Sequence, residues 1–434
     1  MTLKKYKIPY GRGWQEVSLP EEHLLYDIHG NKAATQGDLP QATLAALRQP
    51  IESEPLQKIV VPGDKVAIVV SDVTRLVRTK EFLPVILNEL NVAGIVDADI
   101  CLVVGLGTHR PHTAAEDLEI YGAEVVQRVK IYQHDCRNNE ELVKLGTTTR
   151  GTPVLINTHV AHADKVIVTG GISLHPMAGF GGGRKGIMPG VSGHATIMAN
   201  HAHALAEVVG AGCNPECEAS LLEGNPFHED MTEAAAFLNP AFLVNVVFTP
   251  DGDLHEVVAG HWYKAWLQGC KDLLAMSAVP IKEKADVVIA SAGGAPKDIN
   301  LYQGTKAHMN AVFAVKPGGI LIMNLECPDI KEPAIFSEWF AKSDILQFEK
   351  EVRADFSIPA FVAFKSRCIV NACTTYMVTL PENFDFVRKT GQIPVATLAE
   401  AWDLAQKQLA QEGKTDYTIT LMSHASSTLP VLTK

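Results

Sequence analysis

A dense set of glycines between residues 170 and 194 constrains the fold of this chain most. The apolar run Val166-Ile167-Val168 precedes it and reads as a buried parallel strand. The residues after it, from Ala195 to Ala206, read as a helix opened by Ser192 or a neighbour. The sequence therefore predicts a strand, a glycine-rich loop and a helix in direct succession.

A glycine-rich loop that enters a helix is the usual geometry for binding an anion, because its N–H groups and the helix start attract negative charge. Arg184 and Lys185 add two full positive charges at this place. The loop lacks the Gly-Lys-Ser/Thr ending of a P-loop and the Gly-x-Gly-x-x-Gly spacing of a dinucleotide fold. Its residues indicate a phosphate or carboxylate site, and the alternative is a flexible surface loop with incidental charges.

Polar residues follow the predicted strands of the first half of the chain. The apolar run 64–70 ends in Asp72, Thr74 and Arg75, and the run 99–104 ends in a segment that carries His109. A helix over 80–90 separates these two runs, and a third strand is expected at 129–132. Strands that alternate with helices predict a parallel sheet, in which ligands bind at the carboxyl ends of the strands.

The pattern repeats in the second half. A hairpin over 242–248 and 254–259 and a helix over 261–276 close the first half, and 280–284 is a plausible linker. Further strands are expected at 285–291, 318–324, 367–370 and 417–421, with a last helix after Thr397 that ends at Gly413. We therefore predict an α/β protein of two α/β domains with largely parallel sheets, residues 1–278 and 279–434, and an active-site cleft between them.

Composition excludes several classes of protein. The formal net charge of -11 over 434 residues argues against a partner nucleic acid. The start of the chain lacks the apolar core of a signal peptide and no apolar run could span a membrane, so we expect a cytoplasmic protein without membrane partners. Most of the eight cysteines lie in apolar surroundings typical of reduced core residues, and the pair Cys213 and Cys217 is a weak metal motif.

Histidines at strand ends could serve as general acids and bases, because imidazole titrates near neutral pH. His109 and His175 stand at two separate strand ends. Arginine and lysine nearby would hold an anionic substrate, most simply a carboxylate. A histidine taken alone is as readily structural, and sequence spacing does not show that these two face each other.

Several separated motifs together resemble the nickel-dependent lactate racemase family. They occur in family order in both halves of the chain: Asp72-x-Thr74-Arg75, Gly107-Thr108-His109-Arg110, His175-Pro176 through Gly179-Phe180 and Arg184-Lys185 to Pro189-Gly190, Asn200-His201, and Tyr302-Gln303-x-x-Lys306.

The resemblance implies nickel held in a nickel-pincer nucleotide, a pyridinium-3-thioamide-5-thiocarboxylic acid mononucleotide. By position, Lys185 would form the covalent thioamide and His201 would be the protein ligand of nickel. His109 and His175 would be the acid/base pair. The remaining family positions divide between substrate and nucleotide: Arg75, Tyr302, Gln303 and Lys306 would bind the substrate carboxylate, and Asp72, Thr74, Gly182, Gly183 and Arg184 would bind the nucleotide and its phosphate.

The resemblance also implies the reaction. One histidine would take the hydroxyl proton of a 2-hydroxy acid while the hydride at C2 moves to the cofactor, and the hydride would return to the other face. Two bases on opposite sides suit a reversible racemase, since each enantiomer meets a base in one direction and an acid in the other. Separate maturation enzymes would supply the cofactor, and a homo-oligomer is one option for the assembly.

Three positions depart from the family pattern. Leu76-Val77-Arg78 follows Arg75 where the family often has proline, and it adds a cation. Arg353-Ala354-Asp355-Phe356 aligns roughly with a stretch that holds a tryptophan in lactate-specific members, and Lys297 is an unexpected charge. An extra cation would suit a diacid such as malate, and the absent tryptophan would leave room for a longer chain or a sugar acid.

Other functions stay open from sequence. An epimerase of a larger hydroxy acid such as an aldonate is one alternative within the family. A zinc-dependent hydrolase using His109, His175 and His201 is another class, although the chain lacks a His-Glu-x-x-His motif. A nucleotide-binding protein without catalytic activity is a third.

Overall fold

The computed structural model describes residues 2–75, 77–342 and 344–433, which divide into two compact units. The central unit comprises residues 33–204 and 214–276. The terminal unit holds both chain ends and comprises residues 1–32, 205–213 and 277–434. Each is an α/β structure with its own six-stranded sheet, and each is described by itself below.

The sheet of the central unit has the order β13-β12-β9-β4-β5-β6. All neighbours are parallel except the hairpin pair β12 and β13. The strands are β4 (Val66–Val70), β5 (Ile100–Val104), β6 (Lys130–Gln133), β9 (Lys165–Ile172), β12 (Phe242–Phe248) and β13 (Leu254–Gly260). β4 is buried along its whole length, as its run of Val, Ala and Ile residues requires in a sheet covered on both faces.

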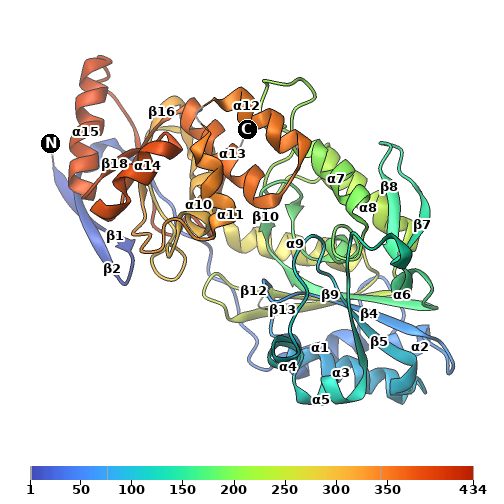
Figure 1. Ribbon diagram of the computed structural model, residues 1–434. Coiled ribbons are helices and arrows are strands. Elements are labelled where there is room, and N and C mark those ends of the chain that lie inside the picture. The colour runs from blue at the N-terminus through green and yellow to red at the C-terminus, as the bar shows by residue number, and fades with distance from the viewer. Residues whose placement is uncertain (1, 76, 343, 434) are drawn as a thin grey trace. The chain divides into compact units, whose positions relative to one another are not determined.

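Helices cover both faces of this sheet (Figure 1). One face carries α1 (Leu39–Arg48), α3 (Thr79–Val92), α4 (Ala114–Tyr121) and α5 (Ala123–Arg128), whose apolar side chains share one core with the strands. α9 (Lys264–Ser277) lies on the other face with α7 (His194–His201) and α8 (Pro226–Leu238). At Gly269 of α9 an added Cβ would lie 2.4 Å from Ile172, so the helix approaches the sheet closely.

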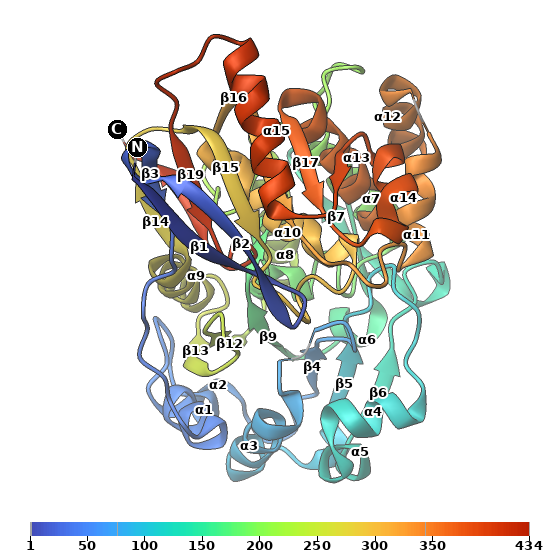
Figure 2. The ribbon, with the colours of Figure 1, turned by 90° about the vertical axis from the view of Figure 1, so that its left-hand side faces the viewer.

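The sheet of the terminal unit has the order β18-β17-β16-β15-β19-β3 and is parallel throughout. Its strands are β3 (Leu24–Asp27), β15 (Ala285–Ser291), β16 (Val315–Asn324), β17 (Thr374–Val378), β18 (Ile393–Val395) and β19 (Ile419–Met422). The hairpin of β1 (Leu3–Tyr10) and β2 (Gly13–Pro20) packs with α15 (Leu398–Gln411) on one face (Figure 2). The helices α10 (Leu301–Ala311) and α13 (Ile358–Ala372) pack on each other in the same unit.

The α/β class with largely parallel sheets is confirmed, and local assignments differ at three places. The expected strand at 367–370 is wrong, because these residues lie inside α13 and the strand is β17. The expected linker at 280–284 begins in a strand, β14 (Ala278–Ile281), which pairs with β20 (Leu429–Leu432). The helix after the glycine-rich stretch is shorter than expected, because α7 ends at His201 and a 3-10 turn follows.

The expected domain boundary at residue 278 lies close to the passage between units at residues 276 and 277. The first 32 residues, however, group with the C-terminal half of the chain. The reason is strand pairing: β3 adds to β19 at the edge of the terminal sheet, and Ile8 and Leu19 are buried in its core. Among the described residues, no helix has both the length and the apolar character needed to cross a membrane.

A carboxyl pair in the central unit couples stability to pH. Glu256 of β13 is hydrogen-bonded to Asp272 of α9, whose oxygens also accept from Gln268 at 3.0 and 3.1 Å. Burial, together with the carboxyl of Asp272, raises the pKa of Glu256 to about 7. Because the folded state holds this proton more tightly than the unfolded chain, stability is lost as pH rises from about 4.5 to 7.

We expect Glu256→Gln to raise the melting temperature by roughly 2 °C at pH 8, because it removes a half-buried charge beside Asp272. The gap should shrink at pH 5, where the native carboxyl keeps its proton. Calorimetry of both proteins at the two pH values measures this, with Glu223→Gln at an exposed position as the matched control. An equal gap at both pH values would contradict the proton-linked origin.

Candidate active site

The sequence-predicted residues of the central unit gather at one edge of its sheet. β4 lies between β5 and β9, so the chain leaves β4 toward one side of the sheet and later returns to the other. Such a switch point opens a crevice at the carboxyl ends of the strands, where ligands bind in open α/β sheets. Asp72 follows β4, His109 follows β5, and His175 follows β9.

Asp72 is buried and fixes both its own loop and His109. Its Oδ1 accepts hydrogen bonds from the Thr74 backbone N–H at 3.1 Å and from the Thr74 hydroxyl at 2.6 Å. Its Oδ2 pairs closely with Nδ1 of His109. Burial opposes the charge of this carboxyl, but the bonds from His109 and Thr74 prevail and lower its pKa. Since a carboxylate only accepts, Nδ1 of His109 carries a proton and the lone pair of the neutral ring lies on Nε2.

His112 is a positioning residue that the sequence did not single out. Its side chain is fully buried, and its Nε2 accepts from the backbone N–H of Val73 at 2.9 Å. Nδ1 lies 2.9 Å from Asp117, the side chain that Gln133 also contacts. Val73 belongs to the loop Asp72–Arg75, so this hydrogen bond from its backbone fixes the loop to the buried ring of His112. Its short spacing from His109 in the sequence was the available signal.

His175 and Lys185 are in direct contact. Nδ1 of His175 accepts from the backbone N–H groups of Met177 and Ala178, at 3.3 and 3.1 Å. A neutral ring that accepts twice at Nδ1 has its proton on Nε2. That Nε2 lies 3.2 Å from Nζ of Lys185, so the lysine accepts and must be a neutral amine.

The electrostatics agree with this assignment. Burial and the charges of Arg75 and Arg184 lower the pKa of Lys185 well below its usual value. Burial lowers the pKa of His175 in the same way; a protonated Lys185 would lower it further, and the charges of Arg75 and Arg184 lower it in either state of the lysine. At the switch point the exposed Arg75 therefore lies close enough to the neutral His175 and Lys185 for its charge to affect both.

The glycine-rich loop is shaped by a buried arginine. Arg184 donates to the carbonyls of Phe180 and Ala178 at 2.9 and 2.7 Å and to His228 at 3.1 Å. Its guanidinium lies 3.9 Å from the centre of the Trp266 ring. Burial lowers the pKa of Arg184 to about 9. The side chain is thus turned into the fold, and this position does not favour the expected contact with a phosphate.

The glycines at 182 and 183 have steric reasons to be glycine. Both have positive φ, +70° and +53°, and a Cβ on Gly183 would lie 2.5 Å from Trp266. The backbone N–H of Gly183 donates to Asn245 at 2.8 Å, so it is used inside the protein. The loop forms a 3-10 turn over Gly183–Gly186, which places Lys185 beside His175.

His201, the expected nickel ligand, is the last residue of α7 and is buried. Its Nδ1 lies 2.8 Å from the carbonyl of Ile197, so Nδ1 carries the proton and the Nε2 lone pair has the form that binds a metal. Burial is the main cause that lowers the pKa of His201, so the ring is neutral. Asn200 before it is fixed by Asp230 at 2.9 Å.

The expected substrate residues Tyr302, Gln303 and Lys306 lie on α10 of the terminal unit. Asn300 caps this helix by accepting from the backbone N–H of Gln303 at 2.8 Å. Nζ of Lys306 donates to Oε1 of Gln303 at 2.9 Å, so these two side chains form one polar group.

Two arginines that lie in the departures from the family pattern are paired with carboxylates. Arg78 forms a double contact with Glu81, through Nε at 2.8 Å and through NH2 at 2.5 Å. Arg353 pairs with Glu349 and also donates to the carbonyl of Ala206. Leu76, within the first departure, lies outside the described residues.

No group of three or more His, Cys, Asp or Glu side chains among the described residues could hold a metal ion. The zinc-hydrolase alternative requires such a group. Cys217, one half of the weak metal motif, is buried and donates to the carbonyl of His203 at 3.2 Å.

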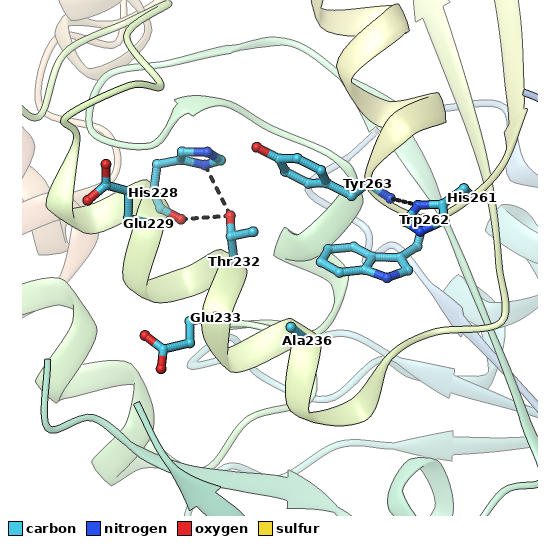
Figure 3. Close-up of a pocket in the computed structure, with 8 residues that line it drawn as sticks. All are labelled: His228, Glu229, Thr232, Glu233, Ala236, His261, Trp262 and Tyr263. Atoms are coloured by element: carbon cyan, nitrogen blue, oxygen red, sulfur yellow. Dashed lines mark hydrogen bonds between the residues drawn. The ribbon is translucent and has the colours of Figure 1, made fainter. Parts of the chain in front are cut away.

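The central unit also has an open pocket of about 410 Å³ between α8 and the start of α9 (Figure 3). None of the sequence-predicted residues lines it. His228 connects it to the glycine-rich loop, because its ring contacts Arg184. The lining is aromatic and acidic: His228, Glu229, Thr232, Glu233, Ala236, His261, Trp262 and Tyr263.

Comparison with known proteins decides the family. Residues 10–211 match the family described as Lactate racemase N-terminal domain, and residues 281–427 match Lactate racemase C-terminal domain. The chain belongs to the lactate racemase family. This membership makes it an isomerase of the racemase type.

Two curated family members are similar over much of the chain. Lactate racemase from Thermoanaerobacterium thermosaccharolyticum is 31% identical over 95% of this chain and 96% of its own. Lactate racemase from Lactiplantibacillus plantarum is 34% identical over 73% of each chain.

Solved structures agree. The lactate racemase apoprotein from T. thermosaccharolyticum matches with a TM-score of 0.84 and 29% identity, covering 99% of this chain and 100% of that one. A protein from Thermotoga maritima shares the fold at a TM-score of 0.62 and 15% identity, covering 94% of this chain and 100% of that one.

The neutral state of Lys185 can be measured. We expect the rate at which an acylating reagent modifies Lys185 to level off at a lower pH than the rates of surface lysines, because burial and the charges of Arg75 and Arg184 lower its pKa. Surface lysines as a class gain reactivity up to about pH 10. Labelling between pH 6 and 10 followed by peptide mass spectrometry measures the profile, with exposed Lys144 as internal reference. A rate at Lys185 that climbs steadily to pH 10 would show a charged lysine.

Proposed function

We propose that this protein inverts C2 of a 2-hydroxy acid, with lactate as the substrate that fits best, using a nickel-pincer nucleotide bound to Lys185. The observation that carries the proposal is the pairing at the switch point: a histidine with its lone pair on Nε2, a histidine with its proton on Nε2, and a neutral lysine. A cytoplasmic location and a need for separate maturation enzymes belong to the same proposal.

The residues present fit the cofactor. A thioamide bond needs an unprotonated amine, which is the state that burial and neighbouring cations favour at Lys185. A nickel ligand needs a neutral imidazole whose other nitrogen is held, and Nδ1 of His201 bonds to the Ile197 carbonyl. When bound, the nucleotide supplies the centre that accepts and returns the hydride of C2. Thr74 and Gly182 stay candidates for nucleotide contacts, whereas we assign Gly183 and Arg184 to shaping the loop.

His109 is suited to act as the base. Asp72 fixes its ring through Nδ1, so Nε2 can accept the hydroxyl proton of the substrate. The buried carboxylate then stabilises the imidazolium that forms. Nearly half of the His109 side chain is exposed, 43%, so a substrate can reach it.

His175 is suited to act as the donor. Its Nε2–H would hydrogen-bond to the substrate oxygen, while the amides of Met177 and Ala178 hold Nδ1. Full proton transfer needs an imidazolium ring, which burial and the charges of Arg75 and Arg184 oppose by lowering the pKa of His175. A thioamide on Lys185 would take the Nζ lone pair into conjugation, so Nζ would no longer accept from Nε2–H of His175. Attachment of the cofactor would therefore release this Nε2–H toward the substrate oxygen.

Arg75 is suited to hold the substrate carboxylate. It is exposed, yet close enough to His175 and Lys185 that its charge lowers the pKa of both. On the terminal unit, Lys306 and Gln303 form a second polar group for the carboxylate, with Tyr302 beside them in the helix. A carboxylate held in place keeps the planar keto acid oriented between the two half-reactions.

The pairing of Arg78 favours a monoacid over a diacid. Arg78 and Lys297 were the added charges that suggested malate, and the guanidinium of Arg78 is neutralised by Glu81. Similarity to two proteins named lactate racemase supports the same substrate. A larger aldonate remains the second candidate, because the stretch around Phe356 has no tryptophan.

The first experiment tests cofactor and substrate together. Protein made with the cofactor-maturation enzymes should carry one nickel and one adduct on Lys185, and it should racemise L-lactate. The rate with L-malate should be at least roughly tenfold lower, since no unpaired Arg78 meets a second carboxylate. Lys185→Ala is the matched control and should lack the adduct. Absence of both nickel and adduct, in cells where another racemase matures, would overturn the proposal.

The second experiment tests the two histidines. We expect His109→Gln and His175→Gln to lower kcat by roughly 10²- to 10⁴-fold, because each removes a proton-transfer group. Asp72→Asn should lower kcat by roughly 10-fold or more, since it removes the carboxylate that fixes the tautomer of His109. Nickel and adduct content should stay unchanged in all three. His162→Gln, at an exposed position, is the control, and wild-type rates in both histidine variants would refute their roles.

A further inference from the structure

Two cysteines of the terminal unit lie in contact although they are distant in sequence. Cys213 ends the segment 205–213, and Cys368 lies on α13. The thiol of Cys368 is hydrogen-bonded to both the side chain and the backbone of Cys213. A Cβ added to the neighbouring Gly212 would lie 3.6 Å from Sγ of Cys368.

Other contacts hold the segment in this place. Leu205 and Cys213 form a β-bridge that closes it, and the backbone N–H of Ala206 donates to Gly212 at 2.9 Å. Arg353 donates to the Ala206 carbonyl at 2.6 Å, and Glu349 accepts from the Gly210 N–H at 3.0 Å. Both Arg353 and Glu349 belong to α12 (Ile345–Ala354), so the segment is fixed to the helix next to α13.

The two thiols differ from the other cysteines in exposure. Five of the eight are buried, whereas Cys213 and Cys368 are partly exposed. Cys101 is the third partly exposed cysteine, but burial raises the pKa of its thiol to about 11.

Cys368 is the better nucleophile of the pair. The hydrogen bonds from Cys213 lower the pKa of the Cys368 thiol, although burial and the charge of Glu349 oppose this, and the charge of Lys365 adds a smaller lowering effect. A thiolate is the form that attacks disulfides.

We propose that Cys213 and Cys368 form a redox-responsive dithiol, which a small-molecule disulfide converts into an intramolecular disulfide. The Cys368 thiolate attacks the disulfide, forms a mixed disulfide and releases one small thiolate. Cys213 then loses its proton and attacks Sγ of Cys368, and the second small thiolate leaves. The protein gives up two electrons and two protons, and the oxidant becomes two thiols.

The disulfide would tie the segment 205–213 to α13 by a covalent bond. This segment begins four residues after His201, the residue proposed to bind nickel, and the residues on either side of it belong to the central unit. The bond therefore restrains the stretch of chain that follows α7. The proposal depends on the two thiols alone and does not require the nickel cofactor.

The test uses the full chain, equilibrated with glutathione mixtures of increasing oxidised fraction. We expect free thiols to fall from eight to six, with a loss of two hydrogens in the intact mass. Cleavage after Glu216 separates Cys213 from Cys217, so mass spectrometry identifies which of them is joined to the peptide of Cys368. Amide exchange in residues 205–213 should slow at least several-fold in the oxidised protein.

Matched variants separate the possible partners. Cys213→Ser and Cys368→Ser should each abolish the disulfide, whereas Cys217→Ser and Cys373→Ser should leave it intact. Cys213→Ser should instead accumulate a stable glutathione adduct on Cys368. A disulfide between Cys213 and Cys217, a persistent glutathione adduct in the wild type, or eight free thiols throughout would overturn the proposal.

Discussion

The candidate site depends on one buried cation, Arg184. Its guanidinium holds the carbonyls of Ala178 and Phe180, while Trp266 covers its face. The amide of Ala178 then donates to Nδ1 of His175, which leaves the ring proton on Nε2 beside Lys185. Arg184 thus fixes the loop that carries Ala178, and the amide of Ala178 fixes the tautomer of His175. Because that tautomer donates from Nε2, Lys185 beside it must be a neutral amine. A surface arginine could not do this, because water would compete for each of its hydrogen bonds.

The positive charges gathered here explain why neutral forms prevail. The charges of Arg75 and Arg184 lower the pKa of both His175 and Lys185, and no carboxylate counteracts them at either group. A further positive charge beside these arginines is unfavourable where water is excluded, so His175 and Lys185 stay unprotonated. The same excess of positive potential attracts an anionic ligand. The site therefore combines affinity for a negatively charged group with an amine that can react.

The sequence predicted the parts of this site that depend on local pattern. Apolar runs followed by polar residues placed Asp72, His109 and His175 at strand ends, and the parallel sheet brought the three strands side by side. It did not predict that Arg184 is buried, because the partner that covers it, Trp266, is more than eighty residues away. Nor did it reveal His112, whose role depends on a backbone N–H that no motif records. The strand wrongly expected at 367–370 is an apolar stretch of α13, where a short run does not distinguish the two periods.

Two histidines of identical chemistry have opposite tautomers here because their neighbours differ. A carboxylate can only accept, so Asp72 forces the proton of His109 onto Nδ1. Backbone amides can only donate, so Met177 and Ala178 force the proton of His175 onto Nε2. The fold therefore sets the two tautomers before any ligand binds, and the proposed roles of one histidine as acceptor and the other as donor depend on this difference. Burial and the charges of Arg75 and Arg184 keep the ring of His175 neutral, so its Nε2–H acts as a hydrogen-bond donor.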